Sequence, residues 1–79
     1  MPTIFSDKGW RFFFYSNEGD PREPIHVHVT GGGGAAKFWV EPVRYDSSKG
    51  FNAKQLREIE SIITSRVDEI KEAWNVHFS

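Results

Sequence analysis

The chain contains no cysteine, which excludes a disulfide framework and a thiolate metal centre. It has no apolar run long enough to span a bilayer, and we expect no secretory signal peptide. With 10 basic against 11 acidic residues, it carries no overall positive field that would attract nucleic acid. We therefore expect a cytoplasmic protein without membrane contact, in which any nucleic-acid binding depends on a local patch.

Aromatic residues are abundant, at 15% of the 79 residues, which is typical of a packed globular domain rather than a disordered one. We find no repeats and no linkers, and so expect one small α+β domain spanning residues 1–79. A chain of this size buries only about 60% of its unfolded surface, so it stands to gain stability from association with a second copy.

Several segments are predicted to be strands, because apolar and polar residues alternate in them or because they are rich in β-branched and aromatic residues. The clearest are 10–15, 25–30 and 36–41, with shorter candidates at 3–5 and 43–45. Turn-forming residues separate them at 6–9, 31–34 and 46–50. The four glycines Gly31–Gly34 predict a hairpin turn rather than a phosphate-binding loop, because no Gly-Lys-Ser/Thr follows them. The pattern predicts an antiparallel sheet of three or four strands.

One long C-terminal helix is predicted from Ala53 to about Asn75. Asn52 is a good N-cap, and Gln55 completes the pattern of a capping box. Apolar residues recur at steps of three and four to form a stripe: Leu56, Ile59, Ile63, Val67, Ile70 and Trp74. This stripe should cover the apolar face of the sheet, leaving the charged side of the helix in solvent.

The opposite sheet face is predicted to be neither a core nor an ordinary solvated surface. Alternation assigns to it Arg11, Phe13, Tyr15, His26, His28, Thr30, Lys37, Trp39 and Glu41. Exposed aromatic area of this kind indicates a partner, a ligand or a dimer contact. We therefore predict a binding face made of Arg11, Phe13, Tyr15, Lys37, Trp39 and Glu41 around His26 and His28.

The His26-Val27-His28 motif has three interpretations. The histidines can be structural, hydrogen bonded across strands. They can act on RNA as acid and base, with nearby cations holding phosphate and aromatic rings stacking bases, so His26 and His28 are also the candidate catalytic residues. They can also chelate zinc if the protein adds another ligand, for which the candidates are Glu18, Asp20, Glu23, Glu41 and His77. None of these has a defining spacing, so we predict no cofactor.

Three segments together resemble a known family. They are Pro24–Val29 with its His-x-His-Val pattern, Ala36–Val43 with Ala-Lys-x-Trp, and Glu72–Asn75 with Glu-x-Trp-Asn. In this combination the chain resembles the small bacterial proteins of domain-of-unknown-function family 4160. Its members often look like one half of a two-gene module, from which a toxin–antitoxin role has been inferred. The resemblance implies the same possibility here.

Taken together, the residues and the resemblance predict a protein-interaction component of such a module, binding a cognate partner protein or a second copy. The alternatives are an RNA-acting toxin that uses His26 and His28, and a metal-binding protein that uses the same pair.

Overall fold

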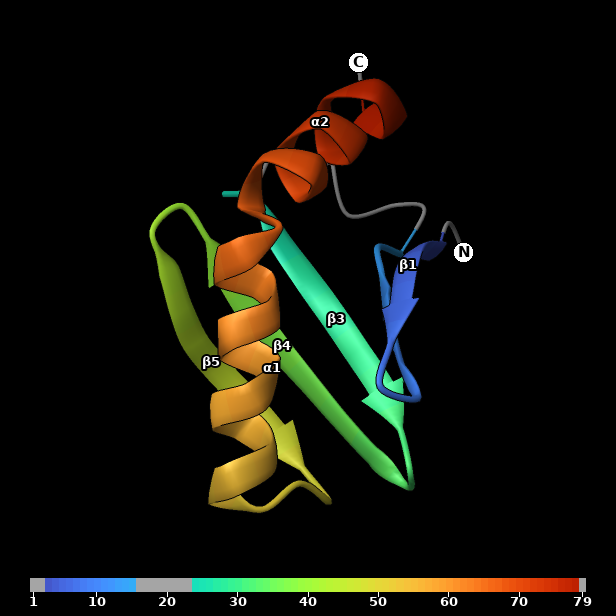
Figure 1. Cartoon of the computed structure of the whole chain (residues 1–79). Helices are drawn as coiled ribbons and strands as arrows, with labels where there is room; N and C mark the ends of the chain where they lie inside the picture. The colour runs from blue at the N-terminus through green and yellow to red at the C-terminus, as the bar shows by residue number, and fades with distance from the viewer. Residues whose placement is uncertain (1–2, 16–23, 79) are drawn as a thin grey trace.

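The structure is a computed structural model that describes residues 3–15 and 24–78. Figure 1 shows the described part as an antiparallel sheet with helices packed against it. In chain order its elements are β1 (Thr3–Asp7), β2 (Trp10–Phe13), β3 (His26–Gly31), β4 (Gly34–Val40), β5 (Val43–Lys49), α1 (Ala53–Ser65) and α2 (Val67–Phe78). The α+β class expected from the sequence is confirmed.

The sheet is an antiparallel meander in which every strand pairs with its sequence neighbour, in the order β1-β2-β3-β4-β5. The glycine run predicted as a hairpin turn joins β3 to β4. Gly31 pairs with Gly34, and the two glycines between them have φ of +58° and +83°. Positive φ at both central residues matches the right-handed twist of the strands, which is why glycine is favoured there.

The predicted number of strands, three or four, was too low, because the described sheet has five. The error comes mainly from 46–50, which the sequence predicted to be a turn. Instead, β5 continues to Lys49 and pairs with β4 as far as Ala35. Its polar residues show no apolar alternation, because an edge strand takes its hydrogen bonds from one neighbour and can leave most side chains in solvent. A β-bulge between Lys37 and Phe38 accommodates the extra residue Asp46.

The prediction of a single long helix was also wrong, because the chain forms two helices that meet at Arg66. Arg66 departs from helical geometry, with φ −120° and ψ 24°. Just before it, the hydroxyls of Thr64 and Ser65 donate to the carbonyl oxygens of Glu60 and Ile62, a local competition that bends helices. The predicted start is confirmed, since Asn52 and Gln55 form a reciprocal capping box.

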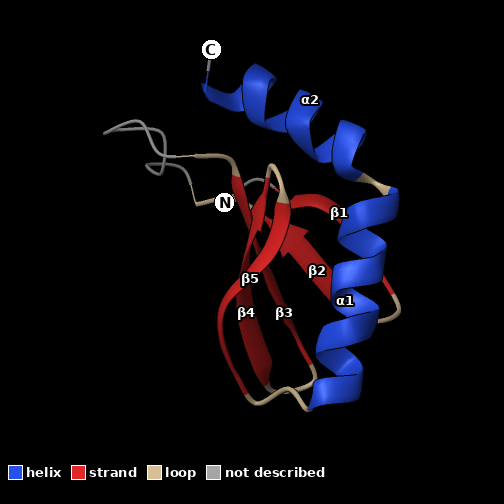
Figure 2. Cartoon of the chain, turned by 90° about the vertical axis from the view of Figure 1, so that its left-hand side faces the viewer, coloured by secondary structure: helices blue, strands red, loops and turns tan. Residues whose placement is uncertain are grey.

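The core lies between α1 and one face of the sheet, and α2 crosses the end of the sheet (Figure 2). The helix stripe supplies its predicted residues, with Ile59, Ile63 and Ile70 completely buried. Phe12, Val27, Val29 and Phe38 face them from the sheet, as do Phe14 and Val40. In the described ranges 3–15 and 24–78, neither helix has the length and apolar character needed to cross a membrane.

Candidate functional site

The candidate site lies on the sheet face turned away from α1, which we call the open face (Figure 2). In-register pairing gives it Arg11, Phe13, His26, His28, Thr30, Ala35, Lys37, Trp39, Arg44, Ser47 and Lys49. One cross-strand row runs from Phe13 through His28 and Lys37 to Ser47. Side chains paired across antiparallel strands are close enough to interact, so the strands bring four chemically different groups together.

His26 is completely buried at the end of this face. Its ring centroid lies 5.1 Å from that of Trp74 on α2 and 5.6 Å from that of Trp39 on β4. Its Nδ1 lies 3.0 Å from the carbonyl oxygen of Pro24, and because a carbonyl only accepts, Nδ1 carries a proton and donates it. These contacts favour a structural role for His26.

His28 has a different environment, although its ring centroid is only 5.4 Å from that of His26. It is half-buried, with Tyr15 edge-on at 4.6 Å and Phe13 stacked at 5.6 Å. The guanidinium of Arg11 lies 4.4 Å from the Phe13 ring centroid, and Phe13 is only 2% exposed. Among these groups, Phe13 is therefore covered, whereas the half-buried Arg11 and His28 and the 42%-exposed Tyr15 are the ones that a ligand can reach.

The open face carries four cations: Arg11, Lys37, Arg44 and Lys49. None of them forms an ion pair within the described residues, whereas Lys8, Arg66 and Lys71 all do, between the helices and the strands or turns. Lys37 instead places its ammonium 4.5 Å from the Trp39 ring centroid. The one carboxylate reaching this face from β5 is that of Asp46, which accepts hydrogen bonds from Trp39 Nε1 at 3.1 Å and from Ser47 at 3.0 Å.

Glu41 lies at the edge of the open face, where it lines a small pocket together with Trp39 and Arg44. It follows β4 in the turn before β5, and its carboxylate lies 3.4 Å from the ammonium of Lys71 on α2. The strand ends at Val40, so Glu41 lies just beyond its paired residues.

Among the described residues, no three acidic or histidine side chains are arranged to hold a metal ion. His77 lies beside Phe14 and Phe78, at the helical end of the molecule. The other candidate ligands Glu18, Asp20 and Glu23 lie outside the described residues. Within the described part, the metal interpretation therefore depends on the two histidines alone.

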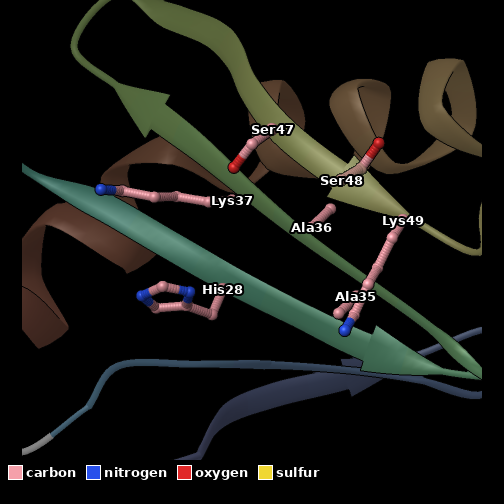
Figure 3. Close-up of a pocket in the computed structure, with 7 residues that line it drawn as sticks. All are labelled: His28, Ala35, Ala36, Lys37, Ser47, Ser48 and Lys49. Carbon is pink, nitrogen blue, oxygen red and sulfur yellow. The ribbon is translucent and has the colours of Figure 1, made fainter.

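A shallow pocket of about 330 Å³ opens on β4 and β5, next to His28 (Figure 3). Ala35 lines it with a short side chain, while Lys37 and Lys49 stand on either side and Ser47 completes it. Sequence reasoning missed Ser47 and Lys49 because their segment was predicted to be a turn, and Arg44 because its brief strand was not assigned a face. Ser47 and Lys49 are polar residues two positions apart, as expected for side chains on one face of a strand. This spacing was the signal that could have assigned them to the open face.

The comparisons with known proteins agree with the resemblance found in the sequence. No curated protein and no solved structure matched the chain. One family model matched, described as "Domain of unknown function (DUF4160)", and it aligns with residues 9–75, which include β2 to β5, α1 and most of α2. The chain therefore belongs to the DUF4160 family.

Proposed function

We propose that the chain is a partner-binding module whose contact surface is the open face, and that its partner is a protein encoded beside it in a two-gene, toxin–antitoxin-like arrangement. The observation that carries this proposal is the group of four cations on the open face, unpaired within the described residues, in a chain whose net charge is −1. Complementary charge directs association between proteins and selects the partner. The proposed partner therefore presents an acidic surface.

The aromatic side chains give this surface its anchors. Tyr15 is exposed and Trp39 is half-buried, and both stand beside cations or an imidazole. Tyrosine, tryptophan and arginine are the residues that most often dominate the energy of protein interfaces. Phe13, which the sequence placed among the anchors, supports them from below because it is buried.

The RNA-acting alternative retains one supporting observation, the half-buried His28 beside the unpaired Lys37. General acid–base catalysis requires a group within hydrogen-bond reach of the substrate. His26 does not offer this in the described conformation, because it is completely buried. The two-histidine mechanism and the metal-binding alternative both remain proposals that a direct test can separate from partner binding.

The test is a binding measurement between the purified chain and the product of the neighbouring gene, with Arg44→Glu and Arg57→Glu as a matched pair. Both arginines are exposed, but Arg44 lies on the open face and Arg57 on α1. We expect Arg44→Glu to weaken binding about tenfold and Arg57→Glu to change it less than about twofold. Equal effects of the two substitutions would show that the open face is not the contact surface.

The same samples are incubated with a short single-stranded RNA, and separately with zinc. Absence of a complex with the neighbouring protein, together with RNA cleavage that His28→Ala abolishes, would replace the proposal by the RNA-acting function. Absence of a complex together with zinc-induced shifts of the His26 and His28 resonances would replace it by the metal-binding function.

A further inference from the structure

We propose that the pocket between β4 and β5 binds a phosphomonoester group. This assignment does not depend on the protein partner, because it concerns a small-anion site at one corner of the open face. Its supporting residues are Lys37, Lys49, Ser47 and His28, which line the pocket together with two alanines (Figure 3).

The shape of the pocket follows from the sequence of β4. Ala35 has the short side chain on the open-face side of that strand and leaves a hollow beside the longer Lys37 and Lys49, whereas the Ala36 side chain belongs to the core. Its volume of about 330 Å³ is at the lower end of the range of small-molecule sites, which begins at about 300 Å³. A phosphate and the first atoms attached to it are therefore a suitable occupant.

The charges of the pocket favour a dianion. Lys37 and Lys49 supply two ammonium groups, and neither forms an ion pair within the described residues. A phosphomonoester carries about −1.5 to −2 charges at neutral pH and has three strong acceptor oxygens. A phosphodiester carries a single charge, so it would leave one ammonium uncompensated.

The lysines have only weak competing contacts to give up, whereas the Ser47 hydroxyl already donates a hydrogen bond to Asp46. The Lys37 ammonium lies on the Trp39 ring, and a cation–π contact at a partly exposed position contributes only about 0.5–1 kcal/mol. Figure 3 shows the Lys49 amine beside Ala35 and the Lys37 side chain directed away from it, so Lys37 would swing toward the ligand on its flexible stem. The Trp39 indole would report this movement directly.

The negative charge of Asp46 repels an anionic ligand, so removing this charge should strengthen binding, whereas removing a lysine charge should weaken it. Its carboxylate is held next to the pocket by Trp39 Nε1 and the Ser47 hydroxyl. Asp46→Asn keeps an acceptor for the Trp39 indole but removes the negative charge. Ser48 is not counted among the ligand groups, because it pairs with the core residue Ala36 rather than with an open-face residue.

The experiment is an NMR titration of the full chain with methyl phosphate, dimethyl phosphate and malonate as probes. We expect methyl phosphate to shift the amides of Ala35, Lys37 and Lys49 and the Trp39 indole saturably, with a Kd on the order of 1 mM. Lys37→Gln and Lys49→Gln should each weaken this binding at least about fivefold, whereas Lys54→Gln on α1 should not. Asp46→Asn should strengthen it about twofold.

Each other outcome contradicts the assignment in a recognisable way. Equal affinity for dimethyl phosphate would show that a singly charged diester is sufficient. Equal affinity for malonate would make the pocket a general carboxylate contact, which fits an acidic protein partner and leaves the proposed function intact. Absence of saturable shifts from all three probes would remove the site, even if the protein partner binds.

Discussion

At the scale of single residues, His26 and His28 show how one motif can hold two different environments. The sequence gives them the same spacing, the same strand and the same predicted face. In the structure, His26 is enclosed by Trp39 and Trp74 and bonded to the Pro24 carbonyl, whereas His28 is half-buried. We therefore assign packing to His26 and surface chemistry to His28.

This assignment predicts unequal losses of stability. His26→Ala removes a fully buried ring and its hydrogen bond, so it should lower the free energy of unfolding by about 2–4 kcal/mol. His28→Ala should lower it by less than about 1 kcal/mol, because the side chain is partly exposed. Urea unfolding of both variants measures the difference, and equal losses would contradict the assignment. Functional comparisons of the two variants need matched fractions of folded protein.

At the scale of elements, the C-terminal half is organised by how α1 begins and ends. Asn52 Oδ1 accepts from the Gln55 amide at 2.8 Å, and Gln55 Oε1 accepts from the Asn52 amide at 2.9 Å. At the other end, the Arg66 guanidinium lies 3.8 Å from the Phe5 ring centroid and pairs with Asp7 at 3.8 Å. The first fixes the start of α1, and the second ties the junction between the helices to β1.

The capping box predicts a measurable contribution. Asn52→Ala should lower the free energy of unfolding by about 1 kcal/mol, because it leaves the Gln55 backbone N–H without its side-chain acceptor. Asn52→Ser, which keeps an acceptor, should recover most of this loss, while Lys54→Ala on the exposed side of α1 serves as a control. Chemical unfolding of the three variants tests the prediction, which fails if Asn52→Ala is as stable as the control.

At the scale of the whole molecule, charge is separated between the two sides of the sheet. The helices have more acidic than basic residues, with the carboxylates of Glu58, Glu60, Asp68, Glu69 and Glu72 against the cations Lys54, Arg57 and Lys71. The open face carries four cations, with the carboxylates of Asp46 and Glu41 beside Trp39. A chain of net charge −1 therefore presents one basic surface. This surface can attract an anionic partner even though the chain as a whole is not basic.

This separation predicts retention of the protein on a cation-exchange matrix at about pH 7.5 and low salt, despite its acidic composition. The double variant Arg44→Gln/Lys49→Gln should elute at clearly lower salt than the unmodified chain. The double variant Lys54→Gln/Arg57→Gln has the same net charge but changes α1, so it should elute close to the unmodified chain. Identical elution of the two variants would show that the open face has no special role.

Much of the candidate site was predictable because strand alternation assigns faces without any knowledge of contacts. That reasoning correctly placed Arg11, His28, Lys37 and Trp39 together. It failed where a strand had no apolar pattern, at Ser47 and Lys49. The pocket could not be predicted either, since it requires the pairing of β4 with β5.

The sequence by itself determined the features that depend on neighbouring residues: strand alternation, the glycine turn, the helix stripe and the capping box. The tertiary structure alone decided that the open face of β3 is buried at His26 and partly accessible at His28. His26 is buried by Trp74, which lies 48 positions further along the chain and reaches it only because the helix bends at Arg66. Burial is a property of distant contacts, so no local pattern could distinguish His26 from His28.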